Sequence, residues 1–242
     1  MNVLTIGNSF SEDATRYLSG IARSQGVHLD VVNVCIGGCP LERHYRNMLG
    51  NKKDYMLQFN GQHTGFCVTL EEALFSREWD VITLQQVSHF SGKKETYYPY
   101  ITELADHIRT CQPKAKLLLQ ETWAYEDGSY RLTQELGYKD HKEMLADVHA
   151  AYAAVAEAEG FDGVIPSGTL FDLMLDRGVA KIHRDTFHAS LGLGRYALGL
   201  LWFRMLTGKN VAENRFRDLD VPATEEEIAI AKACVDSFAP IF

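Results

Sequence analysis

Residues 1–11 are MNVLTIGNSFS, a short apolar run that leads directly into a glycine, an asparagine and two serines. The apolar residues Val3–Ile6 predict a buried strand, and the amphipathic stretch Asp13–Ser24 predicts a helix that ends before Gly26. A strand that turns into a helix begins a βα unit, the building block of a parallel sheet. The stretch has no cationic segment followed by a long apolar run, so it predicts a first strand and not an export signal.

The same alternation of short apolar runs and helical patterns continues along the chain. Further strands are predicted at residues 29–36, 79–84, 116–120 and 161–166, and further helices at residues 100–111, 142–159, 191–206 and 225–238. This alternation predicts a single α/β domain over residues 1–242, a three-layer α/β/α sandwich around a flavodoxin-like, mostly parallel sheet of about five strands. Residues 43–65 lack a clean period, and we expect them to form an irregular insertion near the active site.

Composition narrows the class of protein. The 242 residues carry a net charge of -8 with both signs interspersed, which argues against nucleic acid or an anionic membrane as the main partner. No apolar run is long enough to span a bilayer. The five cysteines are scattered and odd in number, which predicts free thiols and a cytoplasmic location. They are Cys35, Cys39, Cys67, Cys111 and Cys234. No second Cys or His pair accompanies Cys35 and Cys39 at zinc-like spacing, so no metal is expected.

Residues whose side chains could take part in catalysis or binding follow the predicted strands. Ligands of open parallel sheets bind at the carboxyl ends of the strands, so these positions are candidates for a site. Four blocks stand at such positions or late in the chain: Gly7–Ser11, Gly37–Cys39, Gln85–His89 and Asp185–His188.

Ser9, His188 and Asp185 have the residue types of a nucleophilic triad. A serine hydroxyl needs a general base within hydrogen-bond reach, and that base is best oriented by a carboxylate. Asp185 and His188 are at positions i and i+3, so the two side chains can pair locally. At a strand-to-helix turn the Ser9 hydroxyl would be exposed, and its own N–H could bind an oxyanion.

Each of these residues also has a structural interpretation. Ser9 and Glu12 match the S-x-x-E capping box, and on that match alone Ser9 would be a helix cap. Ser11 is a candidate N-cap, and Asp185 could cap a following helix. His188 alone could be an ordinary surface histidine. The joint occurrence of the four blocks, in this order along one chain, favours the catalytic interpretation.

The four blocks together resemble those of the SGNH (GDSL-like) hydrolases, and more narrowly a bacterial branch that opens with a GNSFS-type block. Gly7-Asn8-Ser9 is similar to the first block, Gly-Asp-Ser, with asparagine in place of aspartate, which implies that Ser9 is the nucleophile. Asp185-Thr186-Phe187-His188 matches the last block, Asp-x-x-His, in full. The resemblance spans nearly the whole chain and implies His188 as the base and Asp185 as its orienting partner.

The middle blocks imply an oxyanion hole. The second block of the family supplies a glycine N–H, which points to Gly38, with Gly37 in reserve. The third block departs from the usual Gly-x-Asn, because the chain has Gln85 and Gln86 there. This block looks more like that of the carbohydrate acetylesterase relatives, so either glutamine amide could join Gly38 and the Ser9 N–H as an oxyanion donor.

The resemblance implies an esterase that cleaves short-chain, acetyl-type esters through an acyl-enzyme, with O-acetylated carbohydrate as a candidate substrate and no cofactor. Arg43 and His89 are the predicted substrate contacts. Further polar and aromatic residues expected near the site are His44, Tyr45 and Trp123. The partner would be this small ester, and the sequence leaves the oligomeric state open.

Two other classes of function compete with this prediction. A flavodoxin-like module could hold a phosphate or nucleotide at Gly7–Ser11, but the chain has no glycine-rich phosphate motif, and Glu12 and Asp13 would repel an anion there. Metal-assisted hydrolysis could use His183 with Asp185 and His188, although their spacing is not a usual metal motif.

Overall fold

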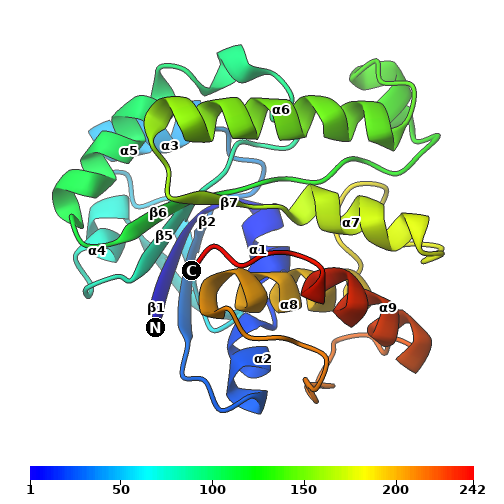
Figure 1. Cartoon of the computed structure of the whole chain (residues 1–242). Coiled ribbons are helices and arrows are strands. Elements are labelled where there is room, and N and C mark those ends of the chain that lie inside the picture. The colour runs from blue at the N-terminus through cyan, green and yellow to red at the C-terminus, as the bar shows by residue number, and fades with distance from the viewer.

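A computed structural model describes residues 1–242 and shows one seven-stranded sheet between two layers of helices (Figure 1). The strand order across the sheet is β4-β3-β2-β1-β5-β6-β7. The strands are β1 (Asn2–Gly7), β2 (Asp30–Cys35), β3 (Tyr55–Phe59), β4 (Gln62–Val68), β5 (Val81–Leu84), β6 (Lys116–Gln120) and β7 (Gly163–Ile165). All but β3 and β4 pair in parallel, so the predicted mostly parallel α/β sandwich is confirmed.

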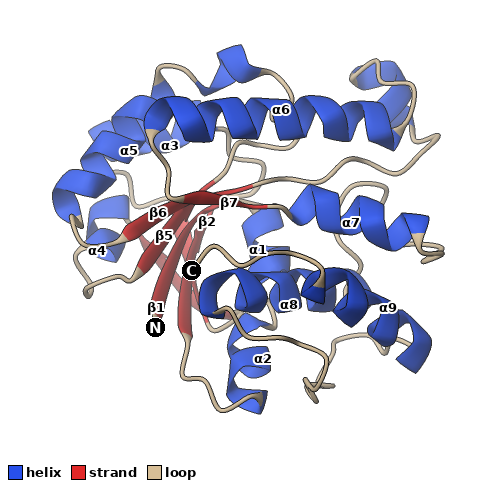
Figure 2. Ribbon diagram, viewed as in Figure 1, coloured by secondary structure: helices blue, strands red, loops and turns tan.

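Helices cover both faces of the sheet (Figure 2). One face carries α1 (Ser9–Thr15), α2 (Leu18–Ser24), α8 (Leu193–Thr207) and α9 (Glu225–Asp236), and the other carries α3 (Leu41–Leu49), α5 (Tyr100–Cys111) and α6 (His141–Glu159). The short α4 (Leu70–Leu74) packs against α3, and α7 (Ser167–Asp176) contacts α6, α8 and α9. A 3-10 turn (Lys94–Tyr97) and a π-helical turn (Arg131–Glu135) complete the helical segments.

The core lies on both faces of the central strands. Val3–Ile6 and all of β5 are buried, because helices cover a parallel sheet on both sides. Helix α8 is buried along nearly its whole length, and its Trp202 and Phe203 are fully enclosed, which confirms that they belong to the core. No helix of the structure has both the length and the apolar character that crossing a membrane requires.

Residues 43–65 are not the irregular insertion that we expected. They complete α3 and then form most of the antiparallel hairpin β3–β4, which pairs with β2 and extends the sheet to seven strands. The hairpin turn is Asn60-Gly61, both with positive φ, of 50° and 76°. An Asn-Gly pair between two strands is a strong signal for a two-residue hairpin turn. At Gly61 a side chain would also collide with the carbonyl oxygen of Arg16.

The first helix begins earlier than predicted and is broken into two. Helix α1 starts at Ser9, and Asn8 is its N-cap, since the Asn8 Oδ1 atom accepts a hydrogen bond from the Phe10 N–H at 3.0 Å. The structural interpretations of Ser9 and Ser11 as caps are therefore wrong. With Asn8 in the capping role, the Ser9 hydroxyl is free to face another partner.

Candidate active site

Ser9 lies where β1, the central strand, passes into α1. The Ser9 hydroxyl is 2.8 Å from Nε2 of His188, although 179 residues separate them in the chain. The two predicted partners from opposite ends of the sequence therefore meet at the carboxyl edge of the sheet.

Asp185 is hydrogen-bonded to the opposite side of the same imidazole. Its Oδ2 atom is 2.7 Å from His188 Nδ1, and its Oδ1 atom accepts from the His188 backbone N–H at 2.9 Å. A carboxylate only accepts, so Nδ1 carries the proton and Nε2 is left to accept from Ser9. Partial burial raises the pKa of Asp185, but these hydrogen bonds from His188 outweigh it and hold the pKa below its usual value. The structure thus brings Ser9, His188 and Asp185 into one relay.

The loop that carries Asp185 and His188 is held by hydrogen bonds from neighbouring segments. Thr186, between them, has a left-handed φ of 76°, which is strained for a β-branched residue. Its carbonyl accepts from the Glu126 N–H at 2.7 Å, and the next carbonyl, of Phe187, accepts from the Trp123 indole at 2.7 Å. These bonds keep the loop in the geometry that the relay needs.

A buried carboxylate on α1 fixes the far side of this loop. Asp13, which is fully buried, accepts from the backbone N–H of Ala189 at 3.1 Å and from the guanidinium groups of Arg184 and Arg195 at 2.8–2.9 Å. Burial raises the pKa of Asp13, and the two arginines oppose that rise. The helix that begins with Ser9 is thus tied to the residue that follows His188.

Two backbone N–H groups are available as oxyanion donors. Ser9 is the first residue of α1, where a helical N–H has no partner in a preceding turn. The Gly38 N–H makes no backbone hydrogen bond, and Gly38 has a φ of 60°, which glycine adopts without strain. Asn8 connects the two positions, because its Nδ2 atom donates to the Cys39 carbonyl at 3.2 Å. Both predicted backbone donors line the same pocket as His188.

The two glutamines do not line this pocket, so the structure contradicts their predicted place in the oxyanion hole. Gln85 Nε2 donates to Asn8 Oδ1 at 2.7 Å, beneath the nucleophile turn. Gln86 is fully buried and holds the chain around it: its Oε1 atom accepts from the N–H groups of Leu41 and Val87, and its Nε2 atom donates to Thr96. The amide groups of both glutamines therefore bond to neighbouring parts of the chain and do not line the pocket.

The pocket at Ser9 has a volume of about 230 Å³. Besides the residues already described it is lined by Phe10, Val87, Ser88, His89, Tyr125, Arg131 and Phe187. Of the predicted substrate contacts, only His89 is among them. Ser88 and Tyr125 share a hydrogen bond between their hydroxyls at 2.8 Å.

Arg43 does not reach the pocket, and that prediction is wrong. It lies on α3, where its guanidinium is 3.8 Å from Asp54. The neighbouring His44 is fully buried against the hydroxyl of Tyr55, and Tyr45 packs on Tyr100. Helix α3 therefore directs these side chains into the layer that covers the sheet or to its outer surface.

Trp123, which was expected near the site, is buried and stacks on Phe10 at 4.0 Å, so it supports the site and does not line the pocket.

Other residues that do line the pocket were not predicted from the sequence. Ser88 and Phe187 stand inside the quoted blocks, and Tyr125 follows β6 at the carboxyl edge, so position along the strands could have indicated them. Arg131 belongs to the segment after Tyr125 and carries no motif.

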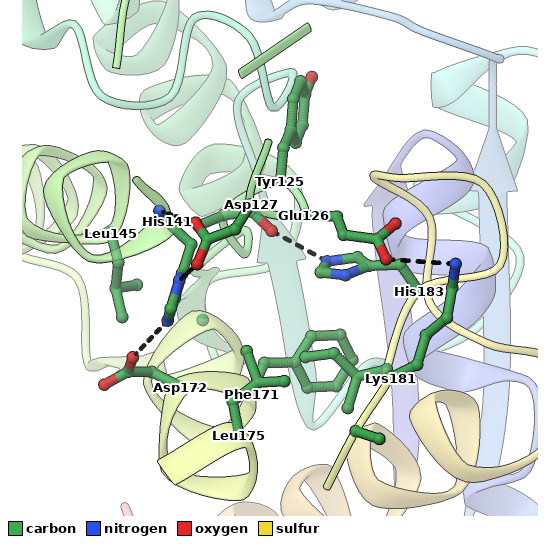
Figure 3. Close-up of a pocket in the computed structure, with 14 residues that line it drawn as sticks. Tyr125, Glu126, Asp127, His141, Leu145, Phe171, Asp172, Leu175, Lys181 and His183 are labelled. Carbon is green, nitrogen blue, oxygen red and sulfur yellow. Dashed lines mark hydrogen bonds and ion pairs between the residues drawn. The ribbon is translucent and has the colours of Figure 1, made fainter. Parts of the chain in front are cut away.

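A larger pocket, of about 350 Å³, is lined in part by residues 124–127 and 180–183 (Figure 3). There His141 lies between Asp127 and Asp172, at 2.7 and 3.1 Å. His183 also faces this pocket, and its Nε2 atom bonds to the Ala124 carbonyl at 3.0 Å (Figure 3). His183 is therefore not gathered with Asp185 and His188 into the donor cluster that metal-assisted hydrolysis requires. The one compact group of metal-ligand types is Glu71, His107 and Cys111, on the α4 and α5 helices.

The fold is that of proteins described as SGNH or GDSL-like hydrolases. A protein from Slackia heliotrinireducens, provisionally described as an SGNH hydrolase, superposes with a TM-score of 0.62 at 22% identity, over 85% of this chain and 98% of that one. A variant of an acetyl xylan esterase from Geobacillus stearothermophilus superposes with a TM-score of 0.53 at 15% identity, over 84% of this chain and 93% of that one. At these identities the likeness establishes the fold.

The family itself is identified by sequence. Residues 2–236 match the domain of unknown function DUF4886, and the chain belongs to that family. A DUF4886 family protein from Bacteroides uniformis has a crystal structure that superposes with a TM-score of 0.89 at 30% identity, over 98% of this chain and 93% of that one. A comparison with curated proteins finds no match.

Proposed function

We propose that this protein is a serine hydrolase that cleaves short-chain, acetyl-type esters through an acyl-enzyme, with O-acetylated carbohydrate as its substrate class. One observation carries the proposal: the unbroken relay from the Ser9 hydroxyl through His188 to the Asp185 carboxylate, at 2.8 and 2.7 Å. The relay opens into a pocket, and its geometry has the order of donors and acceptors that activates a serine.

In the proposed reaction, His188 Nε2 takes the Ser9 proton as Ser9 Oγ attacks the ester carbonyl. Asp185 stabilises the imidazolium that forms. The Ser9 and Gly38 N–H groups bind the oxyanion, each contributing roughly 10²–10³ in rate. His188 then passes its proton to the leaving alcohol, and the same imidazole activates the water that releases the acid.

The acetyl preference is supported by the size of the pocket and by fold analogy. A pocket of about 230 Å³, closed in part by Phe10 and Phe187, suits a small acyl group better than a long chain. Esterases with this fold include the acetyl xylan esterase that superposes on this chain, and the inference from that protein to this one is an analogy of fold.

The proposal is tested by covalent labelling with a fluorophosphonate, followed by mapping of the modified peptide by mass spectrometry. We expect one label per chain, on Ser9, and none on Ser11 or Ser88, which serve as internal controls two residues away and across the pocket. Ser9→Ala should abolish labelling. Labelling that persists in this variant, or no labelling of a folded wild-type protein, would contradict the proposal.

A further inference from the structure

Arg131 is a cation without a partner at the mouth of the Ser9 pocket. It begins the π-helical turn, is exposed, and lines the pocket together with Ser9 and His188. Its guanidinium makes no side-chain hydrogen bond and has no carboxylate within 4.0 Å. The other arginines near the site, Arg184 and Arg195, are both paired with Asp13.

Stacking fixes the position of this guanidinium. The Arg131 Cζ atom is 4.1 Å from the centre of the Phe187 ring, and the Phe187 ring is 3.9 Å from the imidazole of His188. Arginine on an aromatic face keeps its N–H edges free for a planar acceptor. Arg131 and His188 thus both contact the Phe187 ring, which is tilted by 38° to the imidazole.

The charge around the pocket favours an anion. No aspartate or glutamate lines it, and Arg131 is its only lysine or arginine. Glu135 lies one turn further along the chain and forms no ion pair with Arg131; its negative charge raises the pKa of His89, and the positive charge of Lys93 opposes it. Burial first, and then the charge of Arg131, hold the pKa of His89 below its usual value.

We propose that Arg131 selects esters that carry a carboxylate a few atoms from the scissile carbonyl. The guanidinium would bind the carboxylate through two parallel N–H donors while the carbonyl lies at Ser9. This inference rests on the proposed function and deepens it by naming a charge on the substrate. The carboxylate could belong to the alcohol part, as in an acetylated acidic sugar, or to the acyl part, as in a half-ester of a dicarboxylic acid.

The test compares matched esters with and without the carboxylate. For the alcohol side, 5-acetoxy-2-nitrobenzoate is compared with 4-nitrophenyl acetate, and for the acyl side, 4-nitrophenyl hemiglutarate is compared with 4-nitrophenyl valerate. The measured quantity is the ratio of kcat/KM for the anionic ester to kcat/KM for its neutral partner. We expect this ratio to fall about tenfold to a hundredfold in Arg131→Met for at least one pair, because a charged hydrogen-bonding partner is lost.

Arg23 provides the control, because it is an exposed arginine on α2 with no ion pair, on another part of the molecule. Arg23→Met should leave both ratios unchanged. In the wild-type protein, raising the salt from about 0.02 M to about 0.5 M should also lower the affected ratio, as expected for a charge at the mouth of a pocket. Equal ratios in the wild type and in Arg131→Met, for both pairs, would overturn the inference.

The failure of this inference is distinguishable from the failure of the proposed function. If Arg131 plays no part in selection, the neutral esters are still hydrolysed in a Ser9-dependent manner while the ratios stay constant. If the proposed function is wrong, no ester of either pair shows hydrolysis that depends on Ser9.

Discussion

The carboxylate of Asp13 accepts a hydrogen bond from the backbone N–H of Ala189, at 3.1 Å, and so joins the helix that begins with Ser9 to the residue that follows His188. The same carboxylate pairs with Arg184 and Arg195, and it is fully buried. Because Asp13 lies on the helix of Ser9 and is bonded to the loop of His188, this one side chain helps to hold Ser9 and His188 together.

Asp13→Asn should therefore lower both stability and activity. Asparagine keeps one acceptor oxygen but carries no charge, so Arg184 and Arg195 lose their buried counter-ion, and the expected loss in the free energy of unfolding is about 3–5 kcal/mol. Urea denaturation followed by circular dichroism measures it. Asp218→Asn, which changes an exposed aspartate without an ion pair, is the control, and a loss as large as that in Asp13→Asn would argue against a special role for Asp13.

Asn8→Asp, which gives the Gly-Asp-Ser block that Gly7-Asn8-Ser9 resembles, should destabilise this protein. The Asn8 amide donates to the Cys39 carbonyl and its oxygen accepts from Gln85 and Phe10, so aspartate would keep the acceptor and lose the donor. An unmet buried carbonyl corresponds to about 1–3 kcal/mol. The exposed Asn51 offers a control, Asn51→Asp, for which thermal unfolding should be nearly unchanged; a more stable Asn8→Asp protein would refute this account.

Gln86→Leu distinguishes a scaffold role from an oxyanion role. The variant removes the acceptor of two backbone N–H groups, those of Leu41 and Val87, and should lower the free energy of unfolding by about 2–4 kcal/mol. A catalytic amide would instead be revealed by a fall in kcat of roughly 10²–10³ in a protein of normal stability. Parallel denaturation and steady-state assays separate the two outcomes.

Asp220 should contribute to the acid limb of the stability profile. The hydrogen bonds from Arg16 lower the pKa of Asp220 from 3.8 to about 2. A carboxylate whose pKa is depressed in the folded state stabilises the protein above its unfolded pKa, and the contribution is lost as the pH falls from about 4 towards 2. Asp220→Asn should thus flatten this part of the profile, and an unchanged pH dependence of unfolding between these values would disprove the assignment. Both side chains are partly exposed, at 21% for Arg16 and 30% for Asp220, so the effect should shrink in high salt.

The sequence indicated that Ser9, His188 and Asp185 could meet because two simple regularities locate them. The alternation of strands and helices places the ends of β1 and β2 at one edge of the sheet, and the three-residue spacing of Asp185 and His188 allows a local pair. The positions after the strands and the three-residue spacing indicated Ser9, Asp185 and His188, and the resemblance to the SGNH hydrolases indicated Gly38.

Other features depend on the orientation of side chains after a strand has ended. Two adjacent glutamines, Gln85 and Gln86, were equally plausible donors, and only the turn after β5 decides that both face the scaffold. Arg131 reaches the pocket from a π-helical turn that has no periodic pattern. The hairpin, by contrast, was predictable, because Asn60-Gly61 between two short runs is a local turn signal, although the surrounding residues 43–65 have no clean helical or alternating period.

Ser9 and His188 are proposed to act as one unit, and a double-mutant cycle measures the coupling between them. The measurement is kcat for hydrolysis of 4-nitrophenyl acetate by Ser9→Ala, His188→Ala and the double variant, each confirmed as folded by circular dichroism. We predict that either single substitution lowers kcat by roughly 10³–10⁶ and that the double variant is no worse than the singles. Wild-type turnover in either single variant, or losses that multiply in the double variant, would contradict the account.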